Sequence, residues 1–106
     1  MQLGDFEQLV LLAALQLGEG AVAADLKARI EAAAERSVSR GALYATLDRL
    51  TSKGLLSWDV EDSAPERGGI PRRRFRLTAA GVDAVRRAHR AVTRLAEGLD
   101  DVLETA

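Results

Sequence analysis

Residues 39–53, SRGALYATLDRLTSK, constrain the fold of this chain more than any other stretch. Three leucines recur there at the spacing of one narrow apolar stripe on a helix: Leu43, Leu47 and Leu50. Ser39 comes first, and its hydroxyl can accept a hydrogen bond from an unpaired backbone N–H of the first turn. Gly54 comes directly after the stretch, where many helices end in a left-handed residue. The stretch therefore predicts a short amphipathic helix with one buried face.

The opposite face of this helix carries small, polar and basic side chains: Arg40, Gly41, Tyr44, Ala45, Asp48, Arg49 and Ser52. It lacks the Glu-to-Lys pairs that are common on a helix face in contact with water alone. The charge pattern is also uneven, because residues 36–76 hold nine Lys or Arg against five Asp or Glu, and residues 1–35 hold two against six. A local basic patch acts on a phosphate backbone even when the net charge of the chain is −1. We interpret the helix as one suited to a DNA groove.

Two further helices are expected before it. The first, Phe6–Leu17 with Asp5 as its cap, is apolar on most sides, which predicts burial against its own domain and against a partner chain. The second covers residues 21–35 and is joined to Ser39 by a short extended link. The second and third helices then form a helix-turn-helix pair.

A basic β-hairpin is expected after Gly54. LLSWDV at residues 55–60 and RRRFRL at residues 72–77 read as two strands, with Phe75 inward and Arg73 beside it. The intervening EDSAPERGGIP has the Pro and Gly content of a loop. The chain is therefore expected to be mostly α (α+β), a winged helix-turn-helix with a two-stranded β-hairpin wing.

A long last helix is expected from Thr78, its cap, to about Leu103. Its apolar positions follow an alternating spacing of three and four, which favours packing against another helix, most simply that of a second subunit. We therefore expect residues 1–78 to form the DNA-binding domain and residues 79–106 to form the dimerisation helix. The dimerisation candidates lie on this helix and on the first one: Phe6, Leu9, Val10, Val85, Val92, Leu95, Leu99 and Val102.

Other classes of protein find little support. Gly18-x-Gly20-x-x-Ala23 loosely matches a dinucleotide-binding fingerprint, but a helix rather than a strand precedes it, so we interpret it as an interhelical turn. With no Cys and one His, the chain shows no catalytic or metal constellation, and neither an enzyme nor a cofactor is expected. The N-terminus does not read as a signal peptide, and the longest apolar run is too short for a membrane span. A cytoplasmic protein is expected.

Three segments carry a family resemblance: LGDFEQLVLLAAL, SRGALYATLDRLTSKGLL and PERGGIPRRRFRLTAAG. In these segments, which with the last helix cover nearly the whole chain, the sequence resembles the PadR family of bacterial transcriptional regulators, in its short form with a single C-terminal helix. The central and wing motifs are fairly specific in combination, whereas either alone fits many winged helices. The resemblance implies a homodimeric repressor that binds an inverted repeat in double-stranded DNA, and in some members is released by a small molecule.

The resemblance assigns DNA contacts by position to Ser39, Arg40, Gly41, Tyr44, Arg67, Gly68, Gly69 and Arg72, and the basic pattern adds Arg49 and Arg74. Phosphate contact is the simplest role for the arginines, and base contact is the alternative. Three departures from the family concern Val22-Ala23, where Tyr-Gly is frequent, Ala45, where Pro is frequent, and Ile70, where a basic residue is usual. The last helix lacks aromatic residues, so the drug-binding pocket of some members is not carried over.

For several residues, the sequence leaves two roles open. Tyr44 either contacts a phosphate or fills the domain edge. Trp58 packs the wing against the body or stacks on a ligand, and His89 is a structural or solvated residue. A different function is also open, in which the winged helix is a dimeric protein-interaction adaptor whose basic wing meets an acidic partner without DNA binding. Replacement of Arg67 and Arg72 by Ala separates the two functions.

Overall fold

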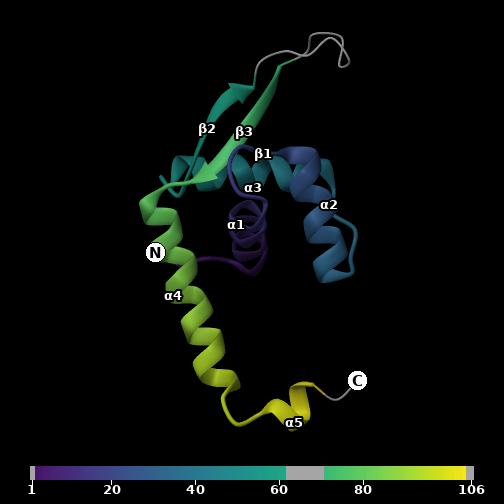
Figure 1. Cartoon of the computed structure of the whole chain (residues 1–106), viewed down its shortest axis with the longest axis vertical. Helices are drawn as coiled ribbons and strands as arrows, with labels where there is room; N and C mark the ends of the chain where they lie inside the picture. The colour runs from purple at the N-terminus through teal and green to yellow at the C-terminus, as the bar shows by residue number, and fades with distance from the viewer. Residues whose placement is uncertain (1, 62–70, 105–106) are drawn as a thin grey trace.

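A computed structural model describes residues 2–61 and 71–104. Helices α1, α2 and α3 surround a single core, a small sheet lies over them, and α4 leads away from this body (Figure 1). The elements, in chain order, are α1 (Asp5–Leu17), β1 (Ala21–Val22), α2 (Ala23–Ala34), α3 (Arg40–Ser52), β2 (Leu56–Glu61), β3 (Arg72–Leu77), α4 (Ala79–Ala96) and α5 (Asp100–Leu103).

The helix predicted from residues 39–53 is confirmed as α3. Ser39 Oγ accepts a hydrogen bond from the backbone N–H of Ala42 at 3.1 Å, so the predicted cap is present. Gly54 has a φ of 77°, the left-handed conformation that stops a helix. The stripe leucines are at most 1 % exposed: Leu43, Leu47 and Leu50. They pack in the core with Phe75 of β3, which holds α3 beneath the sheet.

The sheet has three strands in the order β1-β3-β2, all antiparallel, whereas the sequence predicted two. Trp58 lies opposite Phe75 on one side of β3, and Ala21 lies opposite Phe75 on the other. The additional strand β1 replaces the expected start of the second helix, so that α2 begins at Ala23. Both residues of β1 are buried, and two residues are too few to show an alternating pattern. The sequence therefore predicted them as the start of the following helix.

The last helix is shorter than predicted. Helix α4 ends at Ala96, and the short α5 follows a turn in which Gly98 has a φ of 79°. The apolar spacing continues through this turn, so the pattern predicted one helix where a left-handed glycine divides it into two. The single C-terminal helix is therefore corrected to a long and a short one.

Helix α4 is anchored where it starts. The Thr78 hydroxyl donates to the carbonyl of Gly54 at 2.7 Å, and the backbone N–H of Thr78 donates to the carbonyl of Leu55 at 3.1 Å. Gly81 is buried against that same carbonyl, and a side chain there would collide with it. Four turns further on, Leu95 is 80 % exposed, because α4 has left the body (Figure 1).

Among residues 2–61 and 71–104, every helix is too short or too polar to cross a lipid bilayer.

Candidate nucleic-acid interface

The outer face of α3 is open to solvent at every position that the sequence assigned to it. Arg40 and Gly41 begin the helix, and Tyr44 follows one turn later with 37 % of its surface exposed. Among residues 2–61 and 71–104, a methyl group added at Gly41 would meet nothing within 4 Å. The first turn therefore combines a basic side chain at Arg40 with the absence of a side chain at Gly41. This combination allows a helix to approach base edges in the major groove.

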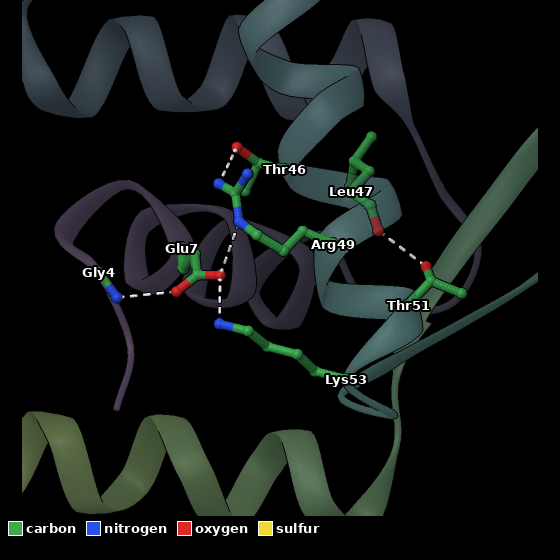
Figure 2. Close-up of polar contacts among 7 residues, drawn as sticks. All are labelled: Gly4, Glu7, Thr46, Leu47, Arg49, Thr51 and Lys53. Atoms are coloured by element: carbon green, nitrogen blue, oxygen red, sulfur yellow. Dashed lines mark hydrogen bonds and ion pairs between the residues drawn. The ribbon is translucent and has the colours of Figure 1, made fainter. Parts of the chain in front are cut away.

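Arg49 lies on the same face but is directed toward α1. Its Nε donates to Oε2 of Glu7 at 3.2 Å, and its Nη2 donates to the Thr46 hydroxyl at 3.2 Å (Figure 2). Lys53 Nζ reaches the same Glu7 oxygen at 2.8 Å. Arg49 is half exposed, yet its guanidinium is oriented by the protein itself, so it is less available to DNA than Arg40.

Glu7 is the centre of this network and is 5 % exposed. Its Oε1 accepts the backbone N–H of Gly4 at 2.8 Å, which closes the first turn of α1. The N-cap is therefore Gly4, and Asp5, the predicted cap, is the first residue of the helix. Burial raises the pKa of Glu7, but the hydrogen bonds from Lys53, Gly4 and Arg49 outweigh it and hold that pKa below its ordinary value. Glu7 is thus an ionised carboxylate that ties α1 to α3.

One face of the wing is a ladder of ion pairs. Arg72 Nη2 lies 2.9 Å from Glu61 Oε1, and both Arg74 and Arg76 reach Asp59, at 3.0 and 3.2 Å. The register explains this, because Glu61 lies opposite Arg72 and Asp59 opposite Arg74. All three arginines keep about two fifths of their side-chain surface exposed. Their positive charge at this face is therefore partly neutralised while the guanidinium groups remain accessible.

The other face of β3 holds Arg73 above three rings. The centre of its guanidinium lies 5.0 Å from the Trp58 ring, 5.3 Å from Phe75 and 5.6 Å from Tyr44. The prediction that Arg73 lies beside Phe75 is confirmed. Trp58 stays 43 % exposed, so its ring covers the arginine rather than filling the core.

A pocket of about 640 Å³ separates the start of α3 from β3. Its floor is apolar, with Val22, Leu43 and Phe75, and its rim is basic, with Lys27, Arg40, Arg72 and Arg73. The pocket shows that the first turn of α3 and the basic strand face one shared concave surface. Arg67, Gly68, Gly69 and Ile70 lie outside the described residues.

The dimerisation candidates fall into three groups by burial. Val10 and Val85 are 0 % and 3 % exposed within a single chain, so they support the chain's own core and offer no surface to a partner. Phe6 and Leu9 are partly buried. The remaining candidates are exposed, from 45 % to 80 %: Val92, Leu95, Leu99 and Val102. Leu12 and Leu15 of α1, which were not among the candidates, are also more than 40 % exposed and border an apolar groove against α2.

Two features of the site escaped the sequence analysis. Glu7 stands three residues after Gly4, which is the spacing of a capping box, but nothing local indicates that it also binds Arg49 and Lys53. The link between Arg73 and Tyr44 joins residues far apart in the sequence and depends on how the sheet lies over α3.

A helix-turn-helix whose second helix faces outward, next to a basic antiparallel hairpin, defines a winged-helix protein. The model of the transcriptional regulator PadR-like family matches residues 11–87, well over half of the chain. The chain belongs to the PadR-like family of transcriptional regulators, whose members are regulators and not enzymes.

Solved structures agree with this assignment. A PadR-like transcription factor from Bacteroides fragilis has a TM-score of 0.71 and 28 % identity, over 92 % of this chain and 88 % of that one. A PadR family regulator from Eggerthella lenta has a TM-score of 0.69 and 29 % identity, over 93 % and 84 %. The PcaV regulator from Streptomyces coelicolor, solved in complex with its natural ligand, shares the fold, with a TM-score of 0.72 and 22 % identity over 96 % and 64 %. No curated protein is significantly similar to the chain.

Proposed function

We propose that this chain is a homodimeric repressor that binds an inverted repeat in double-stranded DNA. The observation that carries the proposal is the open first turn of α3, with Arg40, Gly41 and Tyr44, facing the same concave surface as the basic strand β3. A recognition helix reads base edges in the major groove with its N-terminal residues. The open space around Gly41 allows the helix backbone close to the bases, and Arg40 and Tyr44 are placed to contact base edges or phosphates.

The arginine ladder of the wing supports phosphate binding. Arg72, Arg74 and Arg76 are already held in ion pairs by Glu61 and Asp59, so less conformational freedom is left to lose when phosphates replace these carboxylates. If a dimer neutralises about 6–10 phosphates, the logarithm of the binding constant should fall with the logarithm of salt concentration at about −0.9 per phosphate. A shallow slope would contradict the proposal.

The exposed apolar stripe supports a homodimer. Leu95 on α4 and Val102 on α5 are 80 % and 75 % exposed in the single chain, and Val92, Leu99 and Leu103 are exposed as well. An exposed apolar surface on a projecting helix is covered most simply by a second copy. Two copies of α3 would then enter successive major grooves about 34 Å apart on one face of the duplex. The regulator would act in the cytoplasm, with residues 79–106 as the dimerisation segment.

Response to a small molecule is the last part of the proposal. PcaV, which shares the fold, is described in complex with its natural ligand. In this chain the groove between α1 and α2, about 450 Å³, is lined by Leu9, Leu12, Leu15, Ile30 and Ala33 with Gln16 and Arg29 at its edge. A mainly apolar effector with one polar group matches that lining.

Selection from random duplex DNA tests the proposal. The purified protein, with its dimer mass first established, is incubated with the library at about 150 mM salt. An enriched inverted repeat with half-sites about one helical turn apart is expected. Arg40→Ala should abolish the enrichment, whereas Arg87→Ala, on the exposed part of α4, should preserve it. A folded dimer that enriches no sequence would contradict the repressor and favour the adaptor.

A further inference from the structure

Arg73 is the point at which the wing and α3 meet. Its guanidinium lies within 5.6 Å of the ring centres of Tyr44, Trp58 and Phe75. Its Nη1 also lies 3.4 Å from Oδ1 of Asp48. These partners come from α3, β2 and β3, so one cation connects three elements. An arginine held in this way has its charge and its planar face engaged within the protein.

We propose that Arg73 is a positioning residue that sets the angle between the wing and α3, and so determines how well the protein distinguishes its operator from other DNA. The inference rests on the proposed DNA-binding function. Arg73 differs from its neighbours Arg72, Arg74 and Arg76, which lie on the opposite face of β3 with their ends directed to Glu61 and Asp59. Only 32 % of the Arg73 side chain is exposed.

The arrangement restrains α3 at two places. Tyr44 and Asp48 are four residues apart, so they stand one above the other on successive turns of the helix. Arg73 contacts both, and a rotation of α3 about its axis would break one contact or the other. On the sheet side, Val60 is directly opposite Arg73, which makes Trp58 its diagonal neighbour on the same face. The guanidinium is therefore fixed on the sheet side and on the helix side.

The chemistry requires arginine. A guanidinium is planar and weakly hydrated, so it can lie against aromatic faces while its N–H groups reach a carboxylate. A lysine at this position carries the same charge on a compact, strongly hydrated ammonium, and it cannot reproduce both contacts. Base readout by α3 requires a fixed orientation, whereas phosphate contact by the wing tolerates some freedom. Loss of the Arg73 contacts should therefore reduce specific binding more than non-specific binding.

The test compares Arg73→Lys with Arg76→Lys, which makes the same change on the opposite face of the same strand. Affinity for the selected operator and for a scrambled duplex is measured over a range of salt concentrations. Arg73→Lys is expected to weaken operator binding at least about 10-fold and to leave scrambled-duplex binding and the salt slope unchanged. Because Arg76 belongs to the proposed phosphate-binding ladder, Arg76→Lys is expected to lower both affinities by the same factor and to leave their ratio unchanged. Asp48→Asn, a second variant on the α3 side, should lower the ratio of specific to non-specific affinity.

A different result would overturn the inference. If Arg73→Lys keeps the wild-type ratio of operator to scrambled-duplex affinity, Arg73 is not a positioning residue, and a salt slope lower by about 0.9 in Arg73→Met would identify it as a phosphate contact. Fluorescence gives a readout that does not depend on DNA, because Trp58 is the single tryptophan of the chain. Its emission should shift in Arg73→Lys and stay constant in Arg76→Lys.

The two proposals can fail separately. If the wild-type dimer binds no duplex, the DNA-binding function has failed. A shifted Trp58 emission in Arg73→Lys, with urea unfolding that confirms a folded variant, would then still support the link between the wing and α3. Unchanged emission would overturn the link itself.

Discussion

Oε2 of Glu7 accepts a hydrogen bond from Nε of Arg49 at 3.2 Å, which joins the first turn of α1 to α3 across 42 residues of the sequence (Figure 2). The same oxygen accepts Lys53 Nζ at 2.8 Å. A carboxylate that is 5 % exposed remains ionised there because two cations and a backbone N–H surround it. The orientation of the proposed recognition helix therefore depends on a residue in the first turn of α1, far from α3 in the sequence.

Glu7→Gln should reduce the free energy of unfolding by about 1–2 kcal/mol, since it removes the charge that binds Arg49 and Lys53 and preserves an acceptor for Gly4. The loss stays below that of a fully buried ion pair because Arg49 is 52 % exposed and can be rehydrated. Urea denaturation measures the change. Glu19→Gln, at an exposed position in the turn after α1, is the control and should leave stability within about 0.5 kcal/mol. Equal losses of stability in Glu7→Gln and Glu19→Gln would contradict a stabilising role of the Glu7 ion pairs.

Stability should fall in acid. The hydrogen bonds to Glu7 outweigh its burial and hold its pKa below 4.5. Hydrogen bonds from the backbone N–H of Val38 and from Nζ of Lys27 lower the pKa of Glu31. A carboxyl group with a lower pKa in the folded state binds more protons when unfolded, so its stabilisation is complete above about pH 4.5 and is lost as pH falls through the folded value. Urea midpoints measured from pH 6 down to about pH 3 check this. The difference in urea midpoint between wild type and Glu7→Gln should shrink as the pH falls over this range. A difference that stays constant would contradict a stabilising role of the ionised Glu7.

Gly81→Ala should destabilise the protein by at least about 3 kcal/mol, since the added methyl group would collide with the carbonyl of Leu55 where α4 begins. Gly41→Ala is the matched control, because a methyl group there meets nothing within 4 Å in the part of the chain that the structure describes. The alanine should raise helix stability by about 0.5–1 kcal/mol. Thermal unfolding measures the stability of both variants relative to the wild type. If Gly41 also approaches DNA, Gly41→Ala should lower operator affinity despite its greater stability.

Leu95→Glu should convert the proposed dimer to a monomer. Burial of a leucine contributes about 1.5–3 kcal/mol, and a symmetric dimer contains the residue twice. The dissociation constant of the dimer should therefore rise at least about 100-fold, as measured by sedimentation equilibrium. Thr93→Glu adds the same charge on a different face of α4 and should leave the dimer intact. If both Leu95→Glu and Thr93→Glu are monomeric, the added charge weakens the dimer regardless of its position. If both remain dimeric, Leu95 does not lie in the interface.

Asp59→Asn should strengthen DNA binding. Asp59 binds both Arg74 and Arg76, at 3.0 and 3.2 Å, and the amide would release their positive charge toward the phosphates. Affinity for operator and for scrambled DNA should rise together, with a salt slope steeper by about 1, because the change is electrostatic and not specific for sequence. Fluorescence anisotropy titrations measure this. Asp83→Asn, which loosens an ion pair with Arg87 on α4, should have a smaller effect on either affinity.

Local patterns were sufficient for the central helix. Ser39, the leucine stripe and Gly54 lie within one short segment, and each acts on its own backbone neighbourhood, so the start, the buried face and the end of α3 follow from residue types. The basic strand Arg72–Leu77 was also predicted with its observed bounds. Alternation along the strand placed Arg73 on the face of Phe75, because that rule depends on the strand alone.

Tertiary structure decided what depends on contact between distant segments. Ala21 and Val22 became a strand because β3 offered them a free edge, although their own pattern continued into a helix. Arg49 was directed to Glu7, Arg74 and Arg76 to Asp59, and Arg73 to Tyr44, because in each case the chain placed a partner within reach. The sequence by itself determined which side chains are basic and where the helices and wing occur. The three-dimensional packing decided which of those charges are already engaged within the protein, since a charge interacts with whatever lies near it in space rather than along the chain.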